Sequence, residues 1–243
     1  MELKVIGSSS QGNCYILEGK DSSLIIEAGV PFKKVKPVID FKISKIAGVI
    51  ASHSHGDHSG FIGDYLSYSI PVYSSKETFQ EITHTKLNHN CISVEALKKF
   101  SIGDFTIMPF ELKHDVKCFG YLIRHKEMGT MLFATDTYYI PNTFPGLNHI
   151  LIEANYDKNL LSSNISSGKV HPVVRKRVLS SHMEIGTTDD MLKANDLSKV
   201  KNIVLIHLSS TNSNASEFKK RIQQSTGIPT YIAEKNLTIN LNF

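Results

Sequence analysis

Residues 46–60 read IAGVIASHSHGDHSG, and in this stretch an unbroken apolar run passes directly into a polar cluster. The run Ile46–Ala51 has the pattern of a strand that is buried on both faces. The loop that follows it carries His53, His55, Asp57 and His58 within six residues. We therefore expect these four side chains to gather at the carboxyl end of a buried strand.

Three imidazoles and one carboxylate this close together favour a metal site. A single histidine is more often structural than a ligand, but a cluster without a partner is unfavourable, because protonated imidazoles repel and buried neutral ones need hydrogen bonds. With no thiolate nearby, the set suits Zn²⁺, Mn²⁺ or Fe. His53 and His55 are expected on one side of the loop, and Asp57 and His58 on the other. Two neighbouring metals, each held by one pair, can then draw further ligands from later strands.

The rest of the chain alternates short strands with helices, and antiparallel hairpins are mixed in. Strands are expected at Leu3–Ile6, Cys14–Leu17, Leu24–Glu27, Ile46–Ala51, Pro71–Tyr73, Phe105–Leu112, Phe119–His125, Met131–Ala134, His149–Glu153, Ile203–Leu208, Thr230–Ala233 and Leu237–Asn240, and helices from Ser59, at Lys76–Leu87, at Val170–Leu179, from a Thr187 cap and at Ala215–Gln224. This order predicts an α/β (α+β) fold, a four-layered αββα sandwich of two stacked sheets flanked by helices, in a single domain over residues 1–243.

The composition predicts a cytoplasmic protein. The 243 residues are 41% hydrophobic, which is enough for a sizeable core without disulfides. The cysteines, Cys14, Cys91 and Cys118, lie far apart and form no CxxC pair, which favours a reducing compartment. The amino-terminal residues lack a signal-peptide pattern, and no apolar run approaches the roughly 18 residues of a membrane span. We therefore expect no membrane partner.

The charge of the chain suits an anionic substrate. The formal net charge of +4 is mild and shows no dense basic stripe of the kind that nucleic-acid-binding proteins carry. The one local cluster is Arg175-Lys176-Arg177, with Lys169 and His171 shortly before it. It is either the solvated face of a helix or a surface that steers phosphates, and the sequence leaves both open.

The HxHxDH pattern at His53–His58 resembles the metallo-β-lactamase superfamily. In this chain His114, Asp136 and His207 match that family's later ligands. The resemblance implies one metal on His53, His55, His114 and Asp136, and a second on Asp57, His58, His207 and Asp136, with Zn²⁺ expected and Mn²⁺ as the alternative.

Nearly the whole chain resembles one subgroup, the YycJ/WalJ-like proteins of low-GC bacteria and their phages. The opening hairpin Gly7–Cys14 and the motif Glu153–Asp157 are similar to that subgroup. The resemblance implies that His182 protonates the leaving oxygen or binds the phosphate, so His182 and Asp57 are the candidate catalytic residues. A surface histidine is the alternative for His182. Glu27 replaces the Asp that usually buttresses the metal loop, and Tyr156 stands where His is usual.

A bridging Asp136 in place of Cys points away from the antibiotic-degrading branch and fits phosphodiester hydrolysis. Only about 70 residues separate Asp136 from His207, too few for a complete inserted nucleic-acid-gripping domain. The favoured substrate is therefore small. The resemblance to phage anti-Pycsar enzymes implies hydrolysis of 3′,5′-cyclic nucleotides (cCMP and cUMP, with cAMP and cGMP as further candidates) to nucleoside 5′-monophosphates.

Other readings of the same sequence stay open. The resemblance to those phage enzymes also implies a homodimer, in which the polar loop expected at Asp157–Lys169 covers the site or forms the interface. The main alternative is a single-strand-specific DNA exonuclease of the YycJ/WalJ type, for which nucleic acid is the partner. A lactonase, a thioesterase or a non-catalytic binding module is also compatible with the motif.

Overall fold

A computed structural model describes residues 1–242, and they form two sheets. Their strands are β1 (Glu2–Gly7), β2 (Cys14–Glu18), β3 (Ser23–Ile26), β4 (Ile46–Ile50), β5 (Val72–Ser74), β6 (Cys91–Ser93), β7 (Phe100–Ile102), β8 (Phe105–Leu112), β9 (Cys118–His125), β10 (Gly129–Ala134), β11 (His149–Glu153), β12 (Asn202–Ile206), β13 (Thr230–Ile232) and β14 (Thr238–Asn240). One sheet has the order β14-β1-β2-β3-β4-β5-β6 and the other β13-β12-β11-β10-β9-β8-β7.

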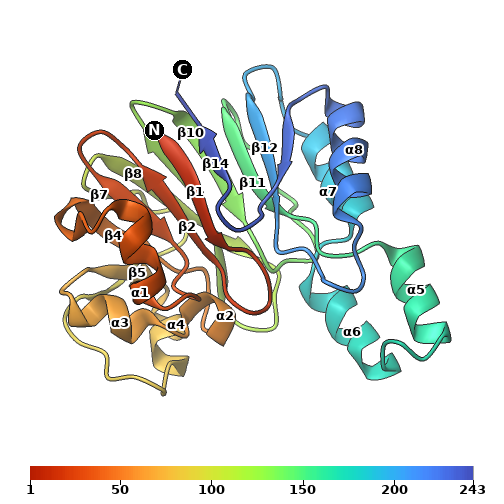
Figure 1. The fold of residues 1–243 in the computed structure, drawn as a ribbon, viewed down its shortest axis with the longest axis horizontal. Helices are drawn as coiled ribbons and strands as arrows, with labels where there is room; N and C mark the ends of the chain where they lie inside the picture. Colours follow the sequence, from red (N-terminus) through yellow and green to blue (C-terminus); the bar gives the residue numbers. More distant parts are fainter. Residues whose placement is uncertain (243) are drawn as a thin grey trace.

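Helices cover the outer faces of the two sheets. They are α1 (Phe32–Val35), α2 (Gly56–Ser59), α3 (Ile62–Ser67), α4 (Lys76–Glu81), α5 (Lys158–Ser166), α6 (Pro172–Ser181), α7 (Ile185–Lys193) and α8 (Ala215–Thr226). Figure 1 shows α1 and α3 on the side of the first sheet, α7 and α8 on the side of the second, and the α5–α6 pair projecting below. The predicted four-layered αββα sandwich is confirmed.

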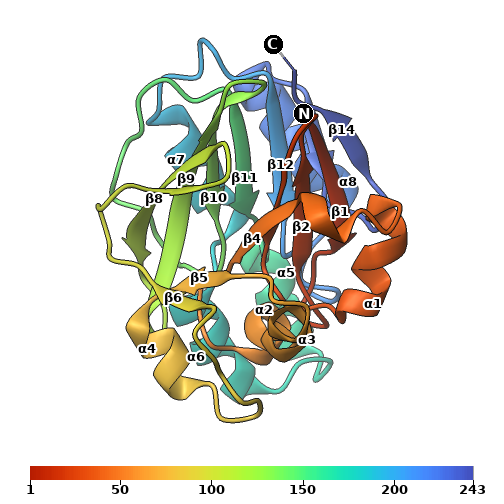
Figure 2. The same cartoon turned by 90° about the vertical axis from the view of Figure 1, so that its left-hand side faces the viewer.

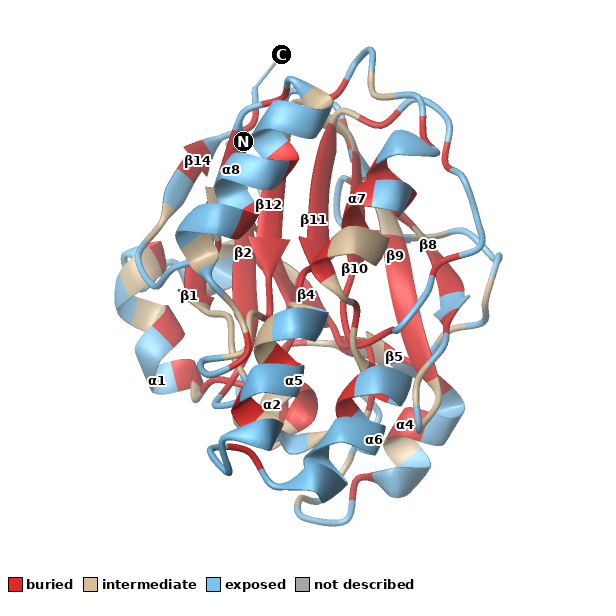
Figure 3. Ribbon diagram, turned by 90° about the vertical axis from the view of Figure 1, so that its right-hand side faces the viewer, coloured by how far each residue is buried: buried red, intermediate tan, exposed pale blue. Residues whose placement is uncertain are grey.

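The largest core lies between the two sheets, where alternate side chains of both meet. Tyr15 and Leu24 of the first sheet and Phe105, Phe133 and Val204 of the second belong to this cluster, and all five are buried. Fully burying a side chain of this size stabilises the fold by about 1.5–3 kcal/mol. In Figure 3 the strands are almost wholly buried, whereas the outward faces of the helices are exposed.

Each sheet has an interior strand that is parallel to both of its neighbours, and the site depends on this arrangement. β4 pairs in parallel with β3 and β5, and β11 pairs in parallel with β10 and β12. The carboxyl ends of these strands therefore meet at one edge of the sandwich, as in other sheets of parallel strands. The apolar run at residues 46–51 is buried on both faces as predicted, apart from the partly exposed Ala47.

The structure corrects several predicted elements. The expected helix Lys76–Leu87 ends at Glu81, since Ile82 is already extended. The expected helix from Ser59 is two short helices, α2 and α3. The helix expected from a Thr187 cap begins at Ile185, because the Glu184 carboxylate accepts hydrogen bonds from the N–H groups of Gly186 and Thr187. The short strands β6 and β7 and helix α1 were not predicted.

The segment Asp157–Lys169, predicted as a polar cover loop, is mostly the helix α5. The Asp157 carboxylate caps this helix by accepting the N–H groups of Asn159 and Leu160. Its Ser/Asn-rich sequence includes a short apolar face, on which Leu161 packs with Val170 and Val178.

Within residues 1–242 the structure contains no helix of the length and apolarity that crossing a membrane requires.

His149 is a buried histidine outside the HxHxDH motif, and its hydrogen bonds keep the ring neutral. His149 begins β11, and its Nε2 lies 3.1 Å from the Leu241 carbonyl oxygen, to which it donates. The amide nitrogen of Asn202 lies 3.2 Å from its Nδ1, which accepts. Both ring nitrogens are thus satisfied only in the neutral tautomer. Burial lowers the pKa of His149 from 6.5 to about 4.

Because the folded pKa of His149 is lower than the unfolded one, its contribution is fully present above about pH 6.5 and is lost as the pH falls towards 4. This pKa difference corresponds to about 3 kcal/mol of unfolding free energy. We expect the difference in stability between the wild type and His149→Gln to shrink between pH 7 and pH 4.5, as measured by denaturant titration. A difference that does not change with pH would show that His149 does not titrate on unfolding.

Candidate metal centre

Seven of the predicted site residues meet at the edge of the sandwich where β4, β8, β10 and β12 end. Figure 2 shows α2 beneath the strands at this edge. The residues come from both sheets: His53 and His55 after β4, Asp57 and His58 in α2, His114 after β8, Asp136 after β10, and His207 after β12.

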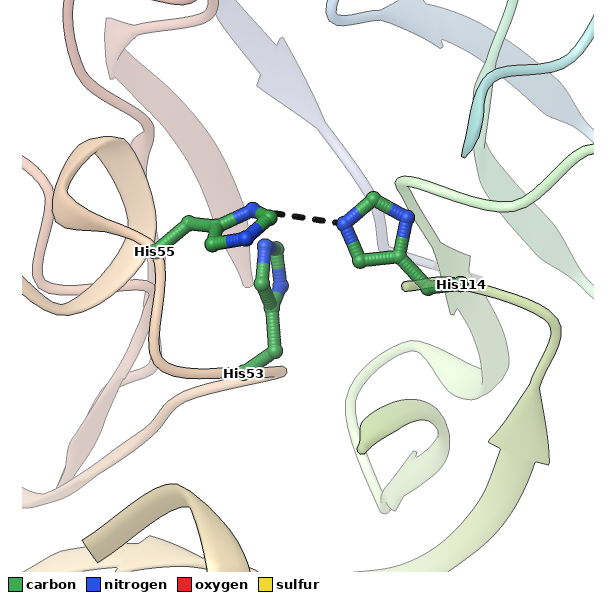
Figure 4. Close-up of side chains that lie close together, drawn as sticks. All are labelled: His53, His55 and His114. Atoms are coloured by element: carbon green, nitrogen blue, oxygen red, sulfur yellow. Dashed lines mark hydrogen bonds between the residues drawn. The ribbon is translucent and has the colours of Figure 1, made fainter. Parts of the chain in front are cut away.

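The first group of possible ligands consists of His53, His55 and His114, whose ligand atoms lie within 4.8 Å of one another. In Figure 4 the three rings face a common space, with His53 and His55 from one loop and His114 from the opposite side. His114 Nε2 lies 3.3 Å from His55 Nδ1. Burial, with the neighbouring His58, lowers the pKa of His53 well below its ordinary value, so this ring is neutral, as metal binding requires.

The second group consists of Asp57, His58 and His207. Asp57 Oδ2 lies 3.3 Å from His58 Nε2 and 3.2 Å from His207 Nε2. Two of its members are buried, whereas the Asp57 side chain keeps 23% of its surface exposed. A further possible group, His53, His58 and Asp136, crosses this division of the motif, so the assignment of the ligands to two separate ions stays a prediction.

The Asp136 carboxylate lies between the two groups. Its Oδ2 is 3.7 Å from His53 Nε2 and 2.5 Å from His58 Nε2. Its Oδ1 is 3.2 Å from His207 Nδ1. Burial alone would raise the pKa of Asp136, but His207 and His58 hold it well below its usual range, so the group is ionised. This is the position that a ligand shared by two metals has to occupy.

The residues present fit two divalent cations. Among the described residues, His53 Nε2 and His114 Nδ1 are buried ring nitrogens without a hydrogen-bond partner. Such atoms are costly unless something compensates them, and a coordinated cation does so. The donor set contains imidazole and carboxylate groups, as in zinc and manganese sites. The cluster therefore provides for a dinuclear metal centre.

Three residues at this centre have a strained backbone. Glu27, Asp136 and His207 have φ values of 69°, 49° and 54°, in the left-handed region that side chains other than glycine rarely adopt. Each of them lies directly after a strand or within two residues of its end. Strain of this kind costs about 1–3 kcal/mol per residue and persists only where the surroundings enforce it.

Glu27 is the residue that replaces the usual Asp of the subgroup, and the structure shows what its longer side chain reaches. It is fully buried. Both carboxylate oxygens lie 3.3 Å from the Ser52 N–H, and Oε2 lies 3.4 Å from His58 Nδ1. Glu27 thus supports the start of the metal loop and one ligand ring at the same time.

Glu153 is a site residue whose role sequence reasoning missed. It is fully buried at the end of β11, and its Oε1 lies 2.7 Å from His182 Nδ1 and 3.0 Å from His207 Nδ1. Its Oε2 accepts the N–H groups of Thr137 and Met183, both at 3.1 Å. The signal was present in the sequence, because β11 reads HILIE and a carboxylate that ends a buried strand needs partners.

His182 is not a surface histidine. It follows α6, its side chain is only 15% exposed, and its Nδ1 lies 3.0 Å from Asp136 Oδ1 as well as close to Glu153. Burial alone would lower the pKa of His182, but the Glu153 and Asp136 carboxylates raise it to about 10. A cation that shares Asp136 would offset part of this effect.

Tyr156, which stands where the subgroup usually has His, is a packing residue. It is buried and belongs to the small cluster of Leu161, Val170 and Val178 beneath α5 and α6. Its backbone pairs with Glu184.

Asn13 was not predicted as a site residue, yet its Nδ2 lies 3.1 Å from His58 Nε2 and 3.4 Å from Asp57 Oδ2.

Known proteins share this fold and parts of this sequence. The exodeoxyribonuclease WalJ of Streptococcus pneumoniae is 26% identical over 224 residues, which cover 86% of this chain and 81% of the relative. The metallo-β-lactamase-fold protein YhfI of Bacillus subtilis superposes with a TM-score of 0.75 at 20% identity and covers 98% of both chains. A diphosphatase of the PhnP family has a TM-score of 0.70 at 15% identity, over 98% of this chain and 96% of its own.

A family model described as the beta-lactamase superfamily domain matches residues 26–208. That match spans all seven predicted ligands, from the motif after β4 to His207. The chain therefore belongs to the beta-lactamase superfamily and is a hydrolase of the metallo-β-lactamase fold.

Proposed function

We propose that this hydrolase is a dinuclear-metal phosphodiesterase that converts 3′,5′-cyclic nucleotides to nucleoside 5′-monophosphates. The observation that carries the proposal is the pair of ligand groups joined by the Asp136 carboxylate. Two divalent ions bound there, Zn²⁺ or alternatively Mn²⁺, would supply an activated water and would neutralise charge on the phosphate. The proposed ligands are His53, His55, His114 and Asp136 for one ion, and Asp57, His58, His207 and Asp136 for the other.

Two side chains are proposed to act on the reacting atoms. The partly exposed Asp57 is the most open carboxylate of the ligand set and can accept a hydrogen bond from the attacking water. His182 is fixed through Nδ1 by Glu153, which leaves its Nε2 edge as the donor towards a leaving oxygen. A ribose 3′-oxygen is a poor leaving group, so a donor at this position assists its departure.

The short stretch of chain between Asp136 and His207 supports a small substrate. Between Asp136 and His207 the chain adds only β11, β12 and three helices, and of these the α5–α6 pair alone projects from the sandwich (Figure 1). We propose that the protein works in the cytoplasm, where a phage-encoded enzyme of this kind would remove the cyclic pyrimidine nucleotides of Pycsar defence. The homodimer also remains a proposal, with Asp157–Lys169, which is mostly α5, as its candidate cover or interface segment.

A second candidate is a single-strand-specific DNA exonuclease. It is supported by the similarity to WalJ over 86% of the chain. It is also supported by α6, because Arg175, Lys176 and Arg177 are exposed on this helix. His182, which follows the last residue of α6, reaches the metal centre. A basic helix beside the site can follow a phosphate backbone.

One assay separates the two candidates. The zinc- or manganese-loaded protein is given cCMP, cUMP, cAMP, cGMP and end-labelled single-stranded DNA in parallel. We expect hydrolysis of cyclic nucleotides, and we expect the charge reversal of Arg175, Lys176 and Arg177 to leave it within about twofold, because one phosphate bound at the metals needs no distant cations. The opposite result would favour the exonuclease. In that case the wild type degrades DNA and leaves cyclic nucleotides intact, and the charge reversal slows the degradation of DNA about tenfold or more.

The metal proposal predicts two ions per chain by elemental analysis. Asp136→Ala should lose both, because its carboxylate contacts histidines of both groups. Asp189→Ala is the matched control, since Asp189 is also a buried carboxylate but is paired with Lys193 and Arg221 away from the centre. It should keep both ions. One ion per chain in a fully active wild type would contradict the proposal.

The role of His182 can be tested by the choice of leaving group. His182→Ala should keep both ions and lose about 10²–10⁴-fold in kcat on a cyclic nucleotide. A diester with a nitrophenolate leaving group needs no proton and should be affected far less. Equal losses on both substrates would mean that His182 only binds the phosphate, and no loss on either would remove it from the reaction.

A further inference from the structure

A cleft of about 680 Å³ lies beside the metal centre. Its walls are the β1–β2 turn, the segment after β12, the end of β13 and Lys34 of α1. A volume of this size is within the range of pockets that hold small molecules. None of the proposed metal ligands lines this cleft, so metal binding alone does not account for it.

The cleft is joined to the second ligand group by direct contacts. Its wall residue Ser8 accepts the backbone N–H of His207 at 2.9 Å, and its wall residue Leu208 directly follows that ligand. Gly12, also in the wall, precedes Asn13, whose N–H donates to the Asp57 carbonyl oxygen at 2.8 Å. Since neighbouring Cα atoms are about 3.8 Å apart, the wall begins one residue away from the ligands.

The lining combines an aliphatic surface with a polar rim. Ile6, Val30, Leu208, Ile232 and Ala233 supply the aliphatic part. The rim carries five serines and the side chains of Gln11, Lys34, Glu234 and Lys235. A flat heterocycle fits such a place, because its faces pack on aliphatic groups and its edge atoms need a few donors and acceptors.

Three long polar side chains of the rim are available to a ligand. Within residues 1–242, no ion pair or hydrogen bond engages the side chains of Gln11, Lys34 or Lys235. The turn beneath them is held by hydrogen bonds, because Ser8 Oγ lies 2.8 Å from Tyr15 Oη and the Gly12 N–H donates to the Ser9 carbonyl oxygen at 2.9 Å. A preformed wall with unused donors reduces the cost of ordering a ligand.

We propose that this cleft binds the nucleoside part of the substrate whose phosphate lies at the metal centre, and that Gln11 and Lys34 read the edge of its base. The inference rests on the proposed phosphodiesterase function, but it concerns recognition and not the reaction. Under this proposal, residues of the β1–β2 turn and of α1 determine which nucleotide binds.

Calorimetric binding to the metal-loaded protein tests the cleft without turnover. Cytidine 5′-monophosphate is compared with ribose 5-phosphate, which carries the same phosphate without a base. We expect the base to strengthen binding at least tenfold. Gln11→Ala and Lys34→Ala should each weaken cytidine 5′-monophosphate about 3- to 10-fold, the effect of one hydrogen bond, and leave ribose 5-phosphate unchanged. Lys33→Ala is the matched control, because Lys33 precedes Lys34 on α1 and is exposed outside the cleft.

Each outcome bears on the cleft separately from the reaction. Equal affinities for the two ligands would overturn the proposal, whether or not any phosphodiester is hydrolysed. Equal losses for both ligands in Lys34→Ala would also overturn it, because the cleft would then hold only phosphate. Base-dependent binding that the two variants weaken would support it, even if the protein failed to hydrolyse every substrate of the assay panel and the proposed function had to be abandoned.

Discussion

The buried carboxylate of Asp136 is the group on which the arrangement of the whole edge depends. It is ionised, fully inside the protein and within 3.7 Å of the rings of His53, His58, His182 and His207. A buried charge costs several kcal/mol unless partners compensate it. The segments after β4 and β12 accordingly bring imidazoles to this carboxylate, and β3 and β11 lead to acids that contact those imidazoles.

Two further carboxylates repeat this logic, one in each sheet. Glu27, next to the end of β3, holds His58, and Glu153, at the end of β11, holds His207 and His182. Each also accepts backbone N–H groups that fix the loops carrying the ligands. The left-handed backbones of Glu27, Asp136 and His207 are therefore enforced by buried electrostatics, and cations shared by ligands from both sheets would tie the sheets together.

The sequence predicted those parts of the molecule that local pattern determines. Each expected strand is present, because buried runs such as β4 are apolar over their whole length, and β11 is apolar between its terminal His149 and Glu153. The errors arose where capping or tertiary contact decides. Asp157 starts a helix in a segment that looks like a loop, and Glu184 starts α7 ahead of Thr187. The HxHxDH motif located the centre, but the pairing of Glu153 with His182 joins residues of different elements and shows in no spacing.

This construction also limits where substrate preference can vary. The ligand loops are strained and pinned by Glu27 and Glu153, so a change there would disturb the metal centre itself. The α5–α6 pair packs largely on its own small cluster, and within residues 1–242 the side chains of Gln11, Lys34 and Lys235 on the rim of the cleft make no hydrogen bond or ion pair. Substitutions in these two regions alter what reaches the centre without altering the centre. Differences in substrate among proteins with this fold are therefore expected to lie in such segments and not in the ligand set.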